Sequence, residues 1–215
     1  MTRVPMERAS LVGRRFRMTY EEWRTWEVEG LKAEWVEGVA VVSMPTTLHH
    51  ADSQGFLSTL LTAYVRFRDL GAVLGHSFEM RLVGRSRLPD LLFVRAAHRQ
   101  RLSEDRLEGP ADLVIELVST DSVVRDHGEK RAEYAAAGVP EYWVVEARPG
   151  RRGGEFLRLV DGSYEPILVD AGGRLWSTVV DGFWLDPAWL GQDPLPDPLD
   201  CLFEIAPEIL AAKVR

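Results

Sequence analysis

One short segment constrains the fold of this chain more than any other: an apolar run that carries a single carboxylate. Residues 113–118 read Leu-Val-Ile-Glu-Leu-Val, so Glu116 is the one polar residue among them. A run of this kind is typical of a strand that is covered on both faces of a sheet. An ionised carboxylate in such a strand is costly unless a cation or a metal ion lies beside it. Glu116 therefore predicts a buried strand with a charged site on one face.

Helices and strands are expected on both sides of this segment. A Glu37-Gly38 turn between two β-prone runs predicts a hairpin. Apolar residues at spacings of three and four predict a long amphipathic helix over about 50–70. A second helix is expected over 121–137, because Gly138 and Pro140 form a C-terminal stop. The other predicted elements are a helix start at 18–22, strands at 33–36, 39–42, 72–83, 89–95, 112–118 and 142–146, and a β meander at 156–160, 164–169 and 178–184.

This order predicts an α/β fold, with a mixed central sheet flanked by helices and an added β meander. A length of 215 residues suits one domain with short appendages. We expect an N-terminal arm over 1–17, the main domain over 18–190, and a proline-rich linker with a helical tail over 191–215. Met18 is an alternative start to Met1.

Composition excludes several classes of protein. One cysteine, Cys201, allows neither an internal disulfide nor a thiolate zinc cage. No apolar run approaches the roughly 18 residues of a membrane span, and we see no secretion signal, so we expect a cytoplasmic protein with no membrane contact. A formal charge of −7 argues against a general nucleic-acid coat. The sequence is still compatible with a local basic surface, because the segment from Arg81 to Arg106 contains seven arginines and three acids.

Two further acids stand at the start of strand-like runs. Asp90 precedes the apolar run at 91–94, and Glu34 lies near the start of the predicted hairpin. Because neighbouring strands are about 4.8 Å apart, acids on adjacent strands can converge on one point. A pair of carboxylates is a suitable set of ligands for Mg²⁺, which prefers oxygen. An internal ion pair or a solvent-facing edge is the alternative for each acid.

The helix predicted after the Glu116 strand carries a matching polar face. Asp126, Lys130 and Tyr134 are spaced four apart and share that face. A helix that directly follows a central strand packs back on the sheet, so this face can reach Glu116. The alternative is a surface pair of Asp126 with Lys130, with Tyr134 half-buried beside it.

Several separated motifs fit one known family. They are Pro89-Asp90, the run 109–119, Asp126 with Lys130, the run 138–143, the upstream residues Glu34, Gly38, Met44-Pro45 and His50, and the terminal Phe183-Trp184-Leu185. In this order they resemble the bacterial Uma-type family of proposed restriction endonucleases, in the PD-(D/E)XK nuclease superfamily. The resemblance covers roughly 18–190 and implies a restriction-endonuclease-like fold.

The resemblance also implies roles for individual residues. Asp90 and Glu116 would bind Mg²⁺ or Mn²⁺, with Glu34 as a possible extra ligand. The superfamily places a lysine two residues after the second acid, where this chain has Val118. The resemblance implies that Lys130 takes the place of this lysine from the following helix. Lys130 would then be catalytic together with Asp90 and Glu116, and would orient the attacking water or stabilise charge on the phosphorane.

Supporting positions are less specific. His50 matches a polar position of the family, although the neighbouring His49 is an alternative, and Asp126 and Tyr134 are expected to support Lys130.

The function expected from this reading is Mg²⁺-dependent endonuclease cleavage of DNA, with Arg81, Arg85 and Arg87 as candidates for backbone phosphate contacts. The residues do not exclude RNA or modified DNA as the substrate. The alternative is a catalytically silent nuclease fold that acts as a dimeric interaction or regulatory module. Seven tryptophans and the β-rich segment after residue 155 favour a homodimer.

Overall fold

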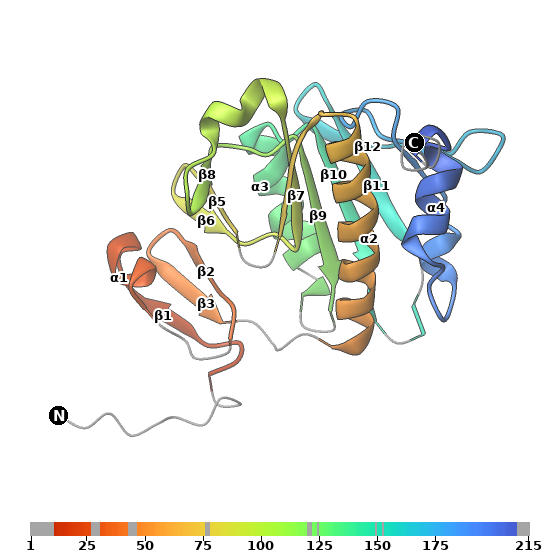
Figure 1. Ribbon diagram of the computed structural model, residues 1–215. Helices are drawn as coiled ribbons and strands as arrows, with labels where there is room; N and C mark the ends of the chain where they lie inside the picture. Colours follow the sequence, from red (N-terminus) through yellow and green to blue (C-terminus); the bar gives the residue numbers. More distant parts are fainter. Residues whose placement is uncertain are drawn as a thin grey trace.

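Two six-stranded sheets and the helices around them make up the computed structural model, which describes residues 11–26, 31–42, 47–75, 78–119, 122–123, 125–148, 150–151 and 153–209 (Figure 1). Met44-Pro45 and most of the predicted N-terminal arm lie outside these residues. The mixed sheets flanked by helices confirm the predicted α/β fold class.

The central sheet is built around β9 (Leu113–Val118), whose six residues are all buried. β9 pairs in parallel with β10 and antiparallel with β7, so it has a neighbour on each side. The strand order is β12-β11-β10-β9-β7-β4. Its other members are β4 (Gly71–Gly75), β7 (Leu91–Arg95), β10 (Glu141–Glu146), β11 (Gly154–Val160) and β12 (Ser163–Pro166).

The two faces of β9 contact different helices. Ile115 and Leu117 belong to the hydrophobic core formed with α2 (Leu48–Phe67). Val114 and Val118 belong to a second core that contains Tyr134 of α3 (Lys130–Ala137). In Figure 1 the two helices lie on opposite sides of the sheet. Because side chains alternate along a strand, Glu116 points to the α3 side.

The second sheet brings the N-terminal hairpin close to this face. Its order is β1-β3-β2-β6-β5-β8. The β2–β3 turn places Glu37 at φ 48° and Gly38 at φ 84°, the positive values that a tight two-residue hairpin turn requires. The strands are β1 (Arg15–Arg17), β2 (Ala33–Val36), β3 (Val39–Val42), β5 (Glu79–Leu82), β6 (Arg85–Arg87) and β8 (Arg106–Glu108).

Local capping explains where the helices begin and end. Thr19 and Glu22 form a reciprocal capping box at the start of α1 (Tyr20–Arg24). The Thr47 hydroxyl accepts the backbone N–H of His50 at the start of α2. α3 ends at Gly138, at φ 81°, as its sequence predicts. The helix expected over 121–137 contains one turn of π-helix, η3 (Arg125–Glu129), directly before α3.

The strand predicted over 178–184 is wrong. This stretch is mostly turn between two short paired strands, β13 (Leu175–Trp176) and β14 (Trp184–Leu185). The Ser177 hydroxyl accepts the backbone N–H groups of Val179 and Val180, and the Glu141 carboxylate accepts that of Thr178. Side chains therefore take the bonds that a neighbouring strand would have supplied.

The strand predicted over 72–83 is also divided. Its first part lies in β4 of the central sheet and its last part in β5 of the second sheet. The residues predicted as one strand therefore belong to two strands in different sheets.

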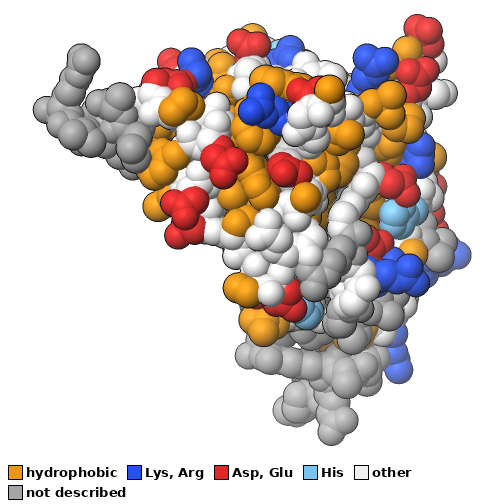
Figure 2. Space-filling model, turned by 90° about the vertical axis from the view of Figure 1, so that its right-hand side faces the viewer, with side chains coloured by type: hydrophobic (Ala, Val, Ile, Leu, Met, Phe, Trp, Pro, Cys, Tyr) orange, Lys and Arg blue, Asp and Glu red, His pale blue; other side chains and the backbone are white. Residues whose placement is uncertain are grey.

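Both ends of the described chain join the fold. Arg15–Arg17, predicted as part of a loose arm, form β1 and pair with β3. At the other end α4 (Pro198–Ile205) buries Cys201 and Leu202 in the same core as α2. Figure 2 shows the face that carries α4, where hydrophobic side chains lie among scattered acidic ones. In the described part of the chain, no helix is long and apolar enough to span a membrane.

Candidate active site

Three carboxylates converge on the ammonium group of Lys130. Its Nζ lies 2.9 Å from Glu116 Oε2, 3.4 Å from Glu34 Oε1 and 3.4 Å from Asp126 Oδ1. These groups come from β9, β2 and η3, and the Lys130 side chain is 3% exposed. The predicted shared face of Asp126, Lys130 and Tyr134 is confirmed, and it contacts the predicted acid of the central strand.

Glu116 is held by two groups of α3. The Tyr134 hydroxyl donates to Oε1 at 2.8 Å, and Lys130 lies beside Oε2. Burial, with the nearby charges of Asp90 and Asp126, raises the pKa of Glu116 to about 7, although Lys130 opposes this shift. The ionised form of Glu116 is therefore disfavoured chiefly by burial and next by the neighbouring acids.

Glu34 is held differently. Arg87 Nη1 donates to Oε2 at 3.1 Å, and the backbone N–H of Leu88 donates to Oε1 at 3.1 Å. Burial opposes ionisation of Glu34, but Lys130 and Arg87 outweigh it and keep its pKa well below the usual range. With both oxygens engaged, Glu34 anchors Lys130 and Arg87 in the site.

Asp90 stands directly before β7 and faces the end of β9. Its Oδ2 accepts the backbone N–H of Leu117 at 2.8 Å and lies 3.3 Å from His50 Nε2. Its Oδ1 lies 3.2 Å from Lys32 Nζ. Burial opposes ionisation, but Lys32 and then His50 keep the pKa of Asp90 well below its usual range.

The structure also distinguishes the two neighbouring histidines. His50 reaches Asp90 from the first turn of α2, whereas His49 is exposed. His50 is thus the one that contacts the site.

The strand register explains how Asp90 and Glu116 meet. Leu91 pairs with Ile115 in the antiparallel β7–β9 ladder, so the residue before Leu91 lies beside the residue after Ile115. Asp90 and Glu116 therefore occupy neighbouring positions across the β7–β9 ladder. Each acid forms an ion pair with a different lysine: Asp90 with Lys32, and Glu116 with Lys130.

The donor set is compatible with a hard divalent cation. Among the described residues, no group of three or more His, Cys, Asp and Glu side chains is arranged to hold a metal ion. Mg²⁺ does not require such a cage, because it is usually bound by one or two carboxylates and keeps several waters. Asp90 and Glu116 supply two carboxylates, and a cation beside Glu116 would offset the burial and the neighbouring acids that raise its pKa. These two acids fit the group, whereas Glu34 also contacts the guanidinium of Arg87 within the protein.

The three arginines predicted to contact DNA phosphates are engaged within the protein. Arg81 stacks over the ring of Tyr20, with 3.7 Å from its guanidinium carbon to the ring centroid. Arg85 donates to Glu37 at 2.8 Å.

The expected phosphate contact of Arg87 does not fit its position. Its side chain is 2% exposed and lies between Glu34, at 3.1 Å, and Glu133, at 2.6 Å. The sequence places it on a β-strand near a basic stretch but does not show that this strand is covered.

Lys32 is the site residue that sequence reasoning missed. It lies directly before β2, outside any recognised motif, and contacts Asp90 across 58 positions of the chain. One signal could have found it, because the chain has only three lysines among its 26 basic residues and Lys130 is another.

Comparisons with known proteins agree with this architecture. A solved structure from Anabaena variabilis, described as a putative nuclease belonging to DUF820, superposes with a TM-score of 0.63. It is 14% identical in sequence, and the match covers 80% of this chain and 99% of the other. At this identity the match shows a shared fold, which is of the restriction-endonuclease type. The comparison with curated proteins gives no match.

The sequence itself matches a family model over residues 18–188. This span contains the central sheet, every strand of the second sheet except β1, α2, α3 and all the site residues described above. That model is Uma2, described as "Putative restriction endonuclease". The chain belongs to the Uma2 family.

Proposed function

We propose that this protein is an endonuclease that hydrolyses phosphodiester bonds in DNA and depends on Mg²⁺ or Mn²⁺. The observation that carries the proposal is the neighbouring positions of Asp90 and Glu116 on adjacent strands, with Lys130 reaching Glu116 from the next helix. Family membership and the nuclease-type fold support the general class. Restriction-endonuclease-like proteins generally use divalent metals, which agrees with the two acids available here.

The residues of the chain have separate tasks in this mechanism. A bound divalent ion would stabilise charge on the phosphate and lower the pKa of a coordinated water. Asp90 and Glu116 would hold that ion. Tyr134 and Lys130 fix the orientation of Glu116, and the Leu117 N–H fixes that of Asp90. Hydrolysis forms one bond from a water oxygen to phosphorus and breaks one phosphodiester P–O bond, whose leaving oxygen takes up a proton.

Isosteric substitutions test the proposal most cleanly. Asp90→Asn and Glu116→Gln each replace a carboxylate with an amide of nearly the same size and remove its charge. Each variant should abolish plasmid nicking in Mg²⁺ or Mn²⁺. Both should also remove Mn²⁺ binding measured by calorimetry. The control is Arg68→Gln, which removes an exposed charge paired with Glu208 at the far end of α2. If both site variants nick as fast as the parent, the nuclease assignment is wrong.

The second candidate function is a catalytically silent member of the fold that acts as an interaction or regulatory module. The enclosure of Lys130 by three acids favours it, because this ammonium is bound within the protein. Calorimetry separates the two candidates. A silent scaffold would bind no Mn²⁺ at Asp90 and Glu116, and it would nick neither DNA nor RNA.

A homodimer and a cytoplasmic location remain predictions. Of the seven tryptophans, Trp176 alone is exposed, beside a segment that also exposes Leu168 and Val169. The apolar surface for self-association is therefore smaller than the tryptophan content suggests. Sedimentation at micromolar concentration would show whether the protein associates.

A further inference from the structure

We propose that Lys32, rather than the buried Lys130, is the lysine that contacts a phosphate of bound DNA at this site. The inference rests on the proposed function and names a further substrate-contacting residue for it. It follows from how differently the two lysines are placed.

The ammonium group of Lys130 is enclosed by acids of the protein. An ammonium group has three N–H donors, and three carboxylates lie within 3.4 Å of this one. Its side chain is 3% exposed, beneath β2 and β9. Moving Lys130 toward DNA would leave three buried acids without their shared cation, which is strongly unfavourable. Lys130 is therefore an internal counter-ion.

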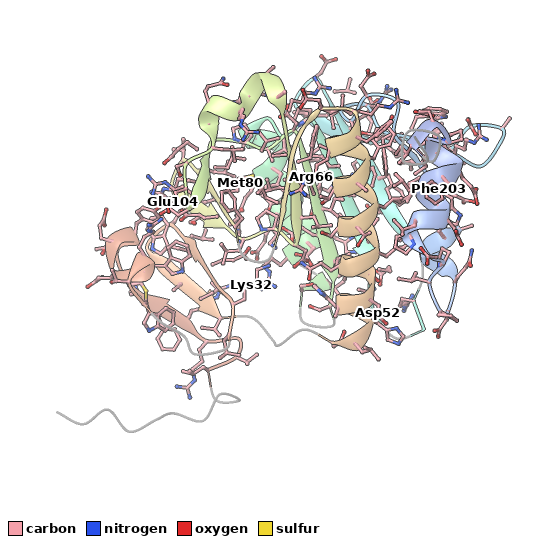
Figure 3. All side chains as sticks on the ribbon, in the orientation of Figure 1. Lys32, Asp52, Arg66, Met80, Glu104 and Phe203 are labelled. Atoms are coloured by element: carbon pink, nitrogen blue, oxygen red, sulfur yellow. The ribbon has the colours of Figure 1, made fainter. Side chains whose placement is uncertain are left out.

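Lys32 is placed where a substrate can reach it. Its side chain is 26% exposed and contacts one acid among the described residues, Asp90, at 3.2 Å. Asp90 and His50 beside it are 11% and 12% exposed, against 2–3% for the side chains of Glu34, Glu116 and Lys130. Lys32 therefore lies on the more exposed side of the site, which is called the open side below. Figure 3 shows Lys32 in the space between the β2–β3 hairpin and the end of β9. A lysine has a long flexible stem, so its ammonium can turn without moving the backbone.

In this proposal Asp90 and a DNA phosphate compete for the ammonium group of Lys32. Without substrate, its charge neutralises the acid that is proposed to bind the metal. A DNA phosphate at the open side offers the ammonium a new anionic partner, and the turn toward it leaves Asp90 Oδ1 free. Removing the Lys32 charge should therefore act in opposite directions, strengthening metal binding and weakening DNA binding.

The experiment measures both effects with Lys32→Gln in the full chain. Mn²⁺ affinity by calorimetry, without DNA, should rise several-fold. Affinity for a short fluorescent DNA duplex, without divalent metal, should fall several-fold, and the slope of log K against log salt should decrease by about 0.9, the value for one phosphate contact. Lys32→Arg keeps the charge and should restore the slope, while Arg68→Gln should change neither affinity.

Two results would overturn the inference. One is a Lys32→Gln protein with the DNA affinity and salt slope of the parent. The other is a parallel loss of Mn²⁺ binding, DNA binding and thermal stability, which would mean that Lys32 only supports the fold. Failure of the proposed function is seen separately, because the parent itself would then neither bind Mn²⁺ nor nick DNA.

Discussion

The ammonium nitrogen of Lys130 lies 2.9 Å from a carboxylate oxygen of Glu116, although the lysine is on α3 and the glutamate on β9. Val118, where the superfamily pattern would place the lysine, shares the Glu116 face but packs in the core with Tyr134. A cation from the helix therefore reaches the carboxylate while the strand stays apolar. Glu116 therefore has a cationic partner although its strand carries no lysine.

Lys130→Met should destabilise the protein strongly. The substitution keeps much of the side-chain volume but leaves Glu34, Glu116 and Asp126 buried without their shared cation. Loss of one partner from a buried charge cluster costs about 3–5 kcal/mol of unfolding free energy. Urea denaturation followed by circular dichroism measures this. Arg131→Gln, next to it on α3 but in an exposed pair with Glu155, should change stability by less than about 0.5 kcal/mol. Equal stability of the two variants would contradict the central role of Lys130.

Tyr134→Phe should cost more stability than the matched Tyr164→Phe. The Tyr134 hydroxyl donates to the Glu116 carboxylate at 2.8 Å, whereas that of Tyr164 donates to the neutral Val139 carbonyl at the same distance. Hydrogen bonds to charged groups contribute about 1.5–3 kcal/mol, and ordinary ones about 0.5–1.5 kcal/mol. Urea denaturation above pH 8, where Glu116 is mostly ionised, compares the two. Equal losses would mean that Tyr134 does not stabilise the charged carboxylate.

Arg87→Gln should reduce stability without changing the salt dependence of DNA binding. Its guanidinium lies between Glu34 and Glu133 and is almost fully buried, so the loss is about 3–5 kcal/mol. Arg99→Gln, on the exposed η2 turn (Ala96–Arg101), should be nearly neutral for stability. A stable Arg87→Gln protein whose salt slope falls by about 0.9 would restore Arg87 as a phosphate contact.

Cys201 should react slowly in the folded protein. Burial, together with Glu204 and Asp200, raises the pKa of its thiol to about 11. Because only the thiolate is nucleophilic, alkylation by iodoacetamide at pH 8 should be about 100-fold slower than in urea-unfolded protein. The pKa is raised on folding, so the stability linked to this thiol is present below about pH 9 and is lost as the pH rises toward 11. The chain has one cysteine, so mass spectrometry reports this site alone. Equal rates in folded and unfolded protein would show that the thiol is accessible.

Local patterns predicted a large part of the fold. The apolar run around Glu116 indicated a strand covered on both faces, and β9 is fully buried. Glu37-Gly38 indicated the hairpin, and Gly138 the end of α3, because each needs a positive φ that the structure shows. The four-residue spacing from Asp126 to Tyr134 placed three side chains on one helix face, which is a property of the helix alone.

Long-range pairing could not be predicted in the same way. The contact of Glu34 with Arg87 depends on the β2–β6 register, which no nearby residue specifies. The same holds for Lys32 and Asp90, which are joined only by the approach of the hairpin to the central sheet. The strand expected over 178–184 failed because Ser177 and Glu141 satisfy the backbone there, and the alternation of side chains does not reveal this.

The central claim is that Asp90 and Glu116 bind one divalent metal ion. A crystal grown or soaked in Mn²⁺ tests it directly through anomalous scattering. We predict a single strong anomalous peak within coordination distance of both carboxylates, and its absence from crystals of Asp90→Asn prepared in the same way. A well-ordered parent site with no peak between these two acids at saturating Mn²⁺ would contradict the claim.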